Sequence, residues 1–383
     1  MNSRFTMDGS DALENQLAQT CRGILSGVQQ IVPPSALEGL VLGGGYGRGQ
    51  GGVLKTSDGD RPYNDLEFYV FIRGNILLAD QRHRAALREL GERLSPQAGL
   101  HVEFKVHSLD KLRCSGVSMF SYDLMAGHKI IFGDGNMFQG CEHHLAADRI
   151  PDSEAARLLF NRCSGLLLAR DFLRQPMLTA EQMDFVGRNL AKAQLGFGDA
   201  VLTVFGHYHW NCRERRARLL KLKSSPLLPD LAEVRRHHAE GVEFKLHPRR
   251  GCTRSKSEFE LLFTELHSLG RQLWLWSESR RLNHAFASAR DYALAGVGKC
   301  PETPAWRNGL LGLKTFGARA LLDGRLFRYP RERLFDALCL LLWDEDAVNE
   351  PALMQRLQNH LSARSACWQD LMLAYRCLWE NYG

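Results

Sequence analysis

The chain has 383 residues, of which 44% are hydrophobic and 24% are charged, and its formal net charge is +6. This length is sufficient for two domains with separate cores, and the composition is ordinary for a globular protein. The longest apolar run, residues 337–343, is far too short to span a membrane.

The termini and the cysteines add to this picture. Residues 1–8 contain no apolar signal core, and the ten cysteines include no C-x-x-C pair. We therefore expect a cytoplasmic protein with reduced, mostly buried thiols and no membrane contact. The mild positive charge suits an enzyme that binds a polyanionic nucleotide, and it is also compatible with RNA binding.

Hydrophobic periodicity predicts a small mixed sheet in the first 148 residues. Residues 11–32 have the spacing of an amphipathic helix, and residues 38–42 form a strand that enters a glycine turn. Residues 49–64 are expected to form a long polar loop. The helices are expected on one face of the sheet. The later elements are a strand at 64–72, a helix at 82–94, a strand at 101–107 and an edge strand at 130–134.

After residue 148 the pattern changes to helices alone. Two capping boxes, Thr179 with Gln182 and Ser255 with Glu258, mark helix starts. The sequence therefore predicts an α+β protein in which an N-terminal helix (1–34) precedes a mixed-sheet domain (35–148) and an all-helical domain (149–383). The helices of the last domain are expected at 153–173, 180–206, 257–282, 331–343, 351–362 and 364–380.

Carboxylates open the second strand. Asp65 and Glu67 are two residues apart, so strand alternation points both to one face, while Leu66 and Phe68 point into a core. Adjacent carboxylates repel each other, and a divalent cation is the usual compensation. Glu103, between apolar residues in the third strand, joins the pair if the two strands are neighbours. Three carboxylates can hold two Mg²⁺ ions, which clamp the attacking and leaving oxygens of a phosphoryl or nucleotidyl transfer.

The glycine-rich run 43–52 offers backbone N–H groups that can hold phosphates. Residues 47–52 fit G-x-G-x-x-G, but no helix follows directly and the acids stand at the start of the next strand, which excludes a dinucleotide fold. A Walker loop is excluded because Leu54 replaces a required glycine, and no kinase-type strand follows the run.

The ordered segments 42–49, 64–71 and 101–107 resemble the DNA polymerase β-like nucleotidyltransferase superfamily, which includes the aminoglycoside nucleotidyltransferases. The resemblance covers residues 36–135, and it implies that Gly44 and Gly45 form the phosphate-contacting turn. It also implies that Asp65, Glu67 and Glu103 are the catalytic metal ligands. Gly45 stands where a serine is frequent, and the loop 49–64 is longer than usual, so this loop is expected to form a lid or to carry substrate contacts.

The resemblance further implies a reaction. A nucleoside monophosphate passes from a nucleoside triphosphate to a hydroxyl acceptor, pyrophosphate leaves, and two Mg²⁺ ions assist. Arg48 is expected to brace the turn or to contact phosphate. On the helix 180–206, Lys192 is the candidate cation for the triphosphate and Asp199 the candidate group for the acceptor; they are seven residues apart and share a face. An ion pair within or between helices is the alternative for both.

The acceptor is open at this point. We expect a small hydroxylated molecule in preference to RNA or protein. Two alternatives are an RNA- or protein-modifying, toxin-like transferase and a catalytically inactive nucleotide-binding module. The basic segments 213–223 and 249–256 are interpreted as solvated surface, with RNA binding as the alternative. The sequence identifies neither the nucleotide nor the oligomeric state.

Overall fold

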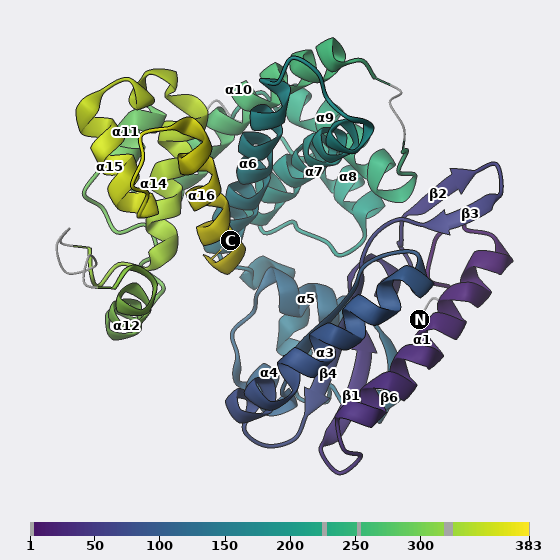
Figure 1. The fold of residues 1–383 in the computed structure, drawn as a ribbon. Coiled ribbons are helices and arrows are strands. Elements are labelled where there is room, and N and C mark those ends of the chain that lie inside the picture. The colour runs from purple at the N-terminus through teal and green to yellow at the C-terminus, as the bar shows by residue number, and fades with distance from the viewer. Residues whose placement is uncertain (1–3, 224–227, 251–253, 318–324, 383) are drawn as a thin grey trace. The chain divides into compact units, whose positions relative to one another are not determined.

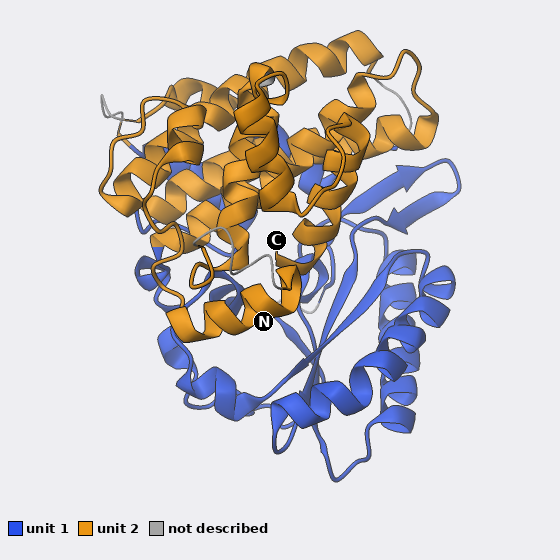
Figure 2. Ribbon diagram, turned by 60° about the vertical axis from the view of Figure 1, so that its left-hand side comes forward, with its two compact units in different colours: residues 1–151, 205–222, 239–250 blue, residues 152–204, 223–238, 251–383 orange. Residues whose placement is uncertain are grey.

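The computed structural model describes residues 4–223, 228–250, 254–317 and 325–382. The chain is an α+β protein with a small mixed sheet and a large helical part (Figure 1). It divides into two compact units, coloured separately in Figure 2. Unit 1 comprises residues 1–151, 205–222 and 239–250, and unit 2 comprises residues 152–204, 223–238 and 251–383.

Unit 1 is built on a four-stranded sheet with the order β5-β4-β1-β6. β1 is antiparallel to both of its neighbours, and β4 is parallel to β5. β6 is at an edge of the sheet, as the sequence predicts. The strands are β1 (Leu37–Leu42), β4 (Leu66–Ile72), β5 (Val102–His107) and β6 (Lys129–Gly133), and they confirm the predicted strands to within two residues.

Side-chain alternation along the strands gives the sheet two apolar faces. Leu42 and Phe68 belong to a core shared with α1 (Asp11–Ile31) and α3 (Ile76–Ala98). Val41 and Tyr69 are adjacent to these two residues in the chain, and they belong to a second core. The second core includes residues of α4 (Leu109–Cys114) and α5 (Met119–Ala126). The prediction of helices on one face is therefore wrong, because these two short helices pack against the other face.

The predicted polar loop at 49–64 is also wrong. This segment forms a two-stranded antiparallel hairpin of β2 (Val53–Thr56) and β3 (Gly59–Pro62). The turn closes at Gly59, whose φ of +114° is accessible to glycine. Lys55 and Asp60 pair across the hairpin at 2.9 Å. Strands of four residues with mostly polar side chains carry too little periodicity to be recognised from sequence.

The regular structure of unit 2 consists of helices, and its described residues contain no strand. The helix α14 is almost entirely buried and packs against α6, α11, α15 and α16. The helices of unit 2 are α6 (Asp152–Leu173), α7 (Ala180–Val204), α10 (Lys256–Leu282), α11 (Ala289–Leu294), α12 (Ala305–Phe316), α14 (Pro330–Trp343), α15 (Pro351–Leu361) and α16 (Trp368–Tyr382). The six predicted helices are present, and the last begins four residues later than expected.

Four described helices of the second half lie outside the six predicted ranges, namely α8 (Cys212–Lys221), α9 (Leu231–Leu246), α11 and α12. α8 belongs to unit 1, and α9 begins in unit 2 and ends in unit 1. The first unit therefore includes segments that follow the predicted domain end at residue 148. None of the described helices is long and apolar enough to cross a membrane.

Candidate functional site

The glycine turn lies directly against the second strand. The N–H of Gly43 donates to the backbone oxygen of Glu67 at 2.9 Å, and residues Gly44–Gly47 form a single helical turn, α2. Gly44 has a φ of +59°, and a Cβ atom there would lie 2.7 Å from Oε1 of Glu67. A Cβ atom at Gly43 would lie 2.3 Å from the Tyr69 ring. Side chains are thus excluded where the turn meets β4.

Gly45 is part of the same close packing. Its backbone oxygen accepts a hydrogen bond from the N–H of Gln50 at 2.8 Å, and a Cβ atom there would lie 3.2 Å from the Gln50 oxygen. The turn is therefore closed on itself through the backbone, and its glycines leave the backbone accessible to a close approach.

The carboxylates occupy neighbouring positions on β4 and β5. Glu67 and Glu103 are directly paired in the register of these two parallel strands. Asp65 is exposed and immediately precedes β4, two residues before the half-buried Glu67. The predicted neighbourhood of the two strands is confirmed, and by alternation the acids belong to the face of Tyr69.

The side chains of these acids are not arranged to coordinate a metal ion in this structure. Among the described residues, no three His, Cys, Asp or Glu side chains are grouped so that they could hold a metal ion. Glu103 lies 3.2 Å from Nζ of Lys105, and both side chains are about half exposed. Carboxylate oxygens are the donors that Mg²⁺ takes, so the donor type fits. A shared ion would require Glu103 to leave Lys105 and turn towards Glu67.

Tyr69 holds the central carboxylate. Its hydroxyl donates to Oε2 of Glu67 at 2.9 Å, and its ring packs against Phe120 and His107. Burial, and then the adjacent charge of Glu67, raise the pKa of Tyr69 well above its ordinary value, so the hydroxyl stays a donor. The opposing charge of Arg48 acts on the same hydroxyl, which places this cation near the acids.

Arg48 is fixed by a polar chain within unit 1. Its Nη1 lies 2.9 Å from Oδ2 of Asp123, and both side chains are largely buried. The Tyr208 hydroxyl lies 3.3 Å from each oxygen of the same carboxylate and accepts from Nη1 of Arg215 at 2.9 Å. This ion pair ties the segment that follows the glycine turn to α5.

Lys245, at the end of α9, lies in the same neighbourhood. Desolvation, followed by the positive charges of Arg48 and Arg215, lowers the pKa of Lys245 to about 8. The carboxylate of Asp123 opposes this shift but does not outweigh the two guanidinium groups.

Sequence reasoning missed several members of this group, namely Asp123, Tyr208, Arg215 and Lys245. Arg215 was interpreted as part of a solvated helix face, yet it is 2% exposed and also donates to the backbone oxygen of His209. The available signal was its i, i+4 spacing from Leu219, which is buried on the same face of α8. The sequence around Asp123 and the sequence around Lys245 contain no pattern that predicts their proximity to Arg48.

The candidates of the second half lie in unit 2. Asp199 is buried in α7, and one of its carboxylate oxygens lies 3.0 Å from Nε2 of His238. Lys192 is exposed on the same helix. Although seven residues separate the two, they do not share an exposed face, since the second half of α7 is buried almost all round.

The second basic segment, 249–256, is described only in part, because residues 251–253 lie outside the described residues. Arg249 and Arg250 are exposed, and the Arg250 guanidinium lies 5.4 Å from the centre of the Tyr63 ring. The segment itself contains no aromatic residue, and the ring near Arg250 comes from a distant part of the sequence.

Comparison with known proteins finds no family model that matches the chain and no curated protein that matches it.

Proposed function

We propose that the protein is a metal-dependent nucleotidyltransferase, which moves a nucleoside monophosphate from a nucleoside triphosphate to a hydroxyl and releases pyrophosphate. The observation that carries this proposal is the register of Glu67 opposite Glu103, beside a glycine turn that contacts Glu67. Acids on adjacent strands next to accessible backbone suit a ligand that combines phosphate groups with divalent cations.

Each residue of the site has a role in this reaction. Asp65, Glu67 and Glu103 would hold Mg²⁺, which when bound neutralises the charge that develops on the phosphate oxygens. Tyr69 fixes one oxygen of Glu67 and so limits the rotation of that carboxylate. Gly44 and Gly45 allow phosphate oxygens to approach the backbone. Glu103, released from Lys105, favours loss of the proton from the acceptor hydroxyl.

The acceptor in this proposal is a small hydroxylated molecule. Arg249 and Arg250 are exposed cations, and Arg250 lies over Tyr63, so an RNA acceptor is the competing choice. The nucleotide base is not assigned, because no contact among the described residues distinguishes one base from another.

The test is to incubate the protein with each labelled nucleoside triphosphate, Mg²⁺ and a cell extract, and to follow the label. Asp65→Asn and Glu67→Gln should each reduce transfer about 100-fold or more, the size of effect seen when one electrostatic contact to developing charge is removed. Both variants should unfold no earlier than the wild type, because carboxylate repulsion is relieved. Glu89→Gln, at an exposed position of α3, is the control and should transfer normally. Normal turnover by Asp65→Asn would contradict the assignment.

A second candidate is a nucleotide-binding module without catalysis, and the Glu103–Lys105 ion pair favours it. A carboxylate neutralised by a lysine is a poorer ligand for Mg²⁺. This candidate predicts nucleotide binding that does not change with Mg²⁺, and no transfer of label to any acceptor. Mg²⁺ titration during nucleotide binding separates the two candidates.

A further inference from the structure

Unit 1 gathers positive charge beside the glycine turn from three distant parts of the sequence. We call Arg48, Arg215 and Lys245 the cation cluster. Arg48 pairs with Asp123, and Arg215 reaches the same carboxylate through the Tyr208 hydroxyl. The side-chain ammonium of Lys245 makes no hydrogen bond or ion pair with any described residue, and its neighbours act on it through their charges alone. Arg48 and Arg215 act on Lys245 as like charges, and an anion bound among the three cations would relieve that repulsion.

Two buried donors near this cluster also have no acceptor among the described residues. They are Nε of Arg48 and Nε2 of Gln50. Gln50 is 2% exposed, and its Oε1 accepts from the N–H of Cys212 at 3.1 Å, so the amide nitrogen is its free end. Cys212 is among the groups that act electrostatically on Lys245. A buried donor without an acceptor costs roughly 1–3 kcal/mol, and a ligand oxygen would remove that cost.

We propose that the cation cluster, together with Gln50, binds an oligophosphate, which is the triphosphate of the nucleotide. The assignment to a nucleotide rests on the proposed function. The guanidinium groups offer several fixed donors to phosphate oxygens, the ammonium offers a mobile point charge, and the amide of Gln50 completes the set. Arg48 acts on the Tyr69 hydroxyl that holds Glu67, so this cluster lies beside the proposed metal ligands.

The presence of three cations favours a ligand with several phosphate groups over a simple carboxylate. A carboxylate offers a single negative charge, whereas an oligophosphate carries several negative charges along its length. Such a ligand can present one phosphate to Asp65, Glu67 and Glu103 and the others to the cation cluster. The site would then bind the part of the substrate that leaves as pyrophosphate.

The first test measures binding of inorganic tripolyphosphate to the full chain by calorimetry, without metal. Lys245→Met should bind it about 10-fold or more weakly, since a charge-assisted hydrogen bond contributes about that factor. Lys221→Met removes the same charge from the exposed end of α8 and is the matched control. Equal affinity of wild type and Lys245→Met, or no binding by the wild type, would overturn the proposal.

Two further readouts separate a ligand site from a structural lysine. Lys245 is desolvated and is repelled by the charges of Arg48 and Arg215, and the opposing effects of Asp123 and the Cys212 thiol are smaller. Lys245→Met should therefore raise the Tm of the ligand-free protein. Wild-type affinity for tripolyphosphate should fall as the pH rises through about 8, because the ammonium loses its proton, and Lys245→Met should lack this fall. A lower Tm with unchanged affinity would show a structural lysine and contradict the proposal.

The nucleotide assignment is tested separately from transfer. A non-hydrolysable nucleoside triphosphate should compete with tripolyphosphate in the wild type, and failure to compete would overturn that assignment. The outcome does not depend on transfer of label, which is the readout for Asp65→Asn and Glu67→Gln. Failure of the proposed chemistry is therefore distinguishable from failure of this binding site.

Discussion

At the residue scale, Tyr69 links the glycine turn to the metal-binding candidate. Its ring occupies the space that a side chain at Gly43 would need, and its hydroxyl fixes one oxygen of Glu67. Hydrogen bonds of this kind orient metal ligands and are as much part of a site as the ligands themselves.

Tyr69→Phe tests this role. The ring packing is retained, so the fold should persist, but Glu67 becomes free to rotate, and Mn²⁺ affinity should fall about 10-fold. Electron paramagnetic resonance of free Mn²⁺ measures the affinity directly and does not require catalysis. Tyr375→Phe, which removes a buried tyrosine hydroxyl from Ser164 in unit 2, is the control. Unchanged Mn²⁺ affinity in Tyr69→Phe would show that the hydroxyl serves packing alone.

The sequence predicted residues whose position follows from local periodicity. Glu67 and Glu103 were predicted because alternation along one strand fixes the face of each side chain. The two acids come together if their strands are neighbours in the sheet, and the parallel pairing of β4 with β5 confirms this. Tyr69 was not predicted to hold Glu67, because a tyrosine in an apolar strand is indistinguishable from a core residue. Arg215 and Lys245 were missed because their neighbours come from distant segments, which no local pattern encodes.

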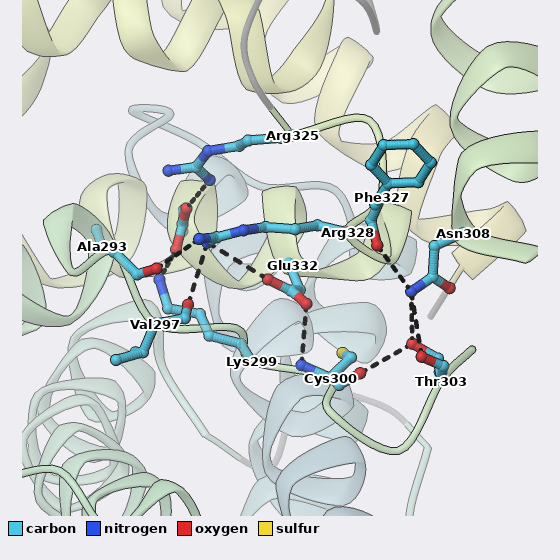
Figure 3. Close-up of polar contacts among 12 residues, drawn as sticks. Ala293, Val297, Lys299, Cys300, Thr303, Asn308, Arg325, Phe327, Arg328 and Glu332 are labelled. Atoms are coloured by element: carbon cyan, nitrogen blue, oxygen red, sulfur yellow. Dashed lines mark hydrogen bonds and ion pairs between the residues drawn. The ribbon is translucent and has the colours of Figure 1, made fainter. Parts of the chain in front are cut away.

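At the element scale, the buried helix α14 carries a charge into the core of unit 2. Asp336 on α14 receives a hydrogen bond from Nζ of Lys299 and lies 2.5 Å from Nη1 of Arg325. Figure 3 shows Lys299 and Arg325, together with Glu332, which accepts from the Cys300 N–H at 3.0 Å. Because Asp336 is inaccessible to water, its neutralising partners decide whether the charge is tolerated.

Replacing Asp336 and replacing Lys299 should lower the unfolding free energy by unequal amounts. Asp336→Asn leaves Lys299 and Arg325 without their carboxylate and should cost about 3–5 kcal/mol of unfolding free energy, typical for an uncompensated buried charge. Lys299→Met should cost less, because Arg325 still neutralises Asp336. Urea unfolding followed by circular dichroism gives both values. A Lys299→Met variant that is as unstable as Asp336→Asn would contradict this account of the cluster.

At the scale of the whole molecule, two histidines make the fold sensitive to acid. Burial is the main cause that lowers the pKa of His360 to about 3 and that of His107 to about 4. An unfolded histidine titrates near 6.5, so between about pH 6.5 and these values the unfolded chain binds more protons than the folded one. The unfolding free energy should therefore fall as the pH drops below 6.5.

His360→Leu should reduce this loss. Neither ring nitrogen of His360 makes a hydrogen bond within the described residues, although Nε2 lies 3.5 Å from Oδ2 of Asp336. Because Lys299 and Arg325 already neutralise Asp336, an apolar side chain of similar size should cost little at pH 7.5. The variant should lose less stability than the wild type between pH 6.5 and 4.5. Unfolding free energies measured across this range provide the test, with His101→Gln at an exposed position as the control. A decline as steep as that of the wild type would show that His360 is not its source.

The discontinuity of unit 1 sets an order of events during synthesis. Its sheet and carboxylates are complete once residue 151 is made, but Tyr208, Arg215 and Lys245 belong to segments that end at residue 250. At about 5–20 residues per second, translation separates these two points by roughly 5–20 s. Until residue 208 is made, Asp123 lacks Tyr208, and Tyr122 and Ile150 lack the ring that joins them in one cluster. Lys245 is absent until nearly the end of the interval. The nascent chain therefore exposes an incomplete first unit on the ribosome, and this stage is where chaperones should engage it.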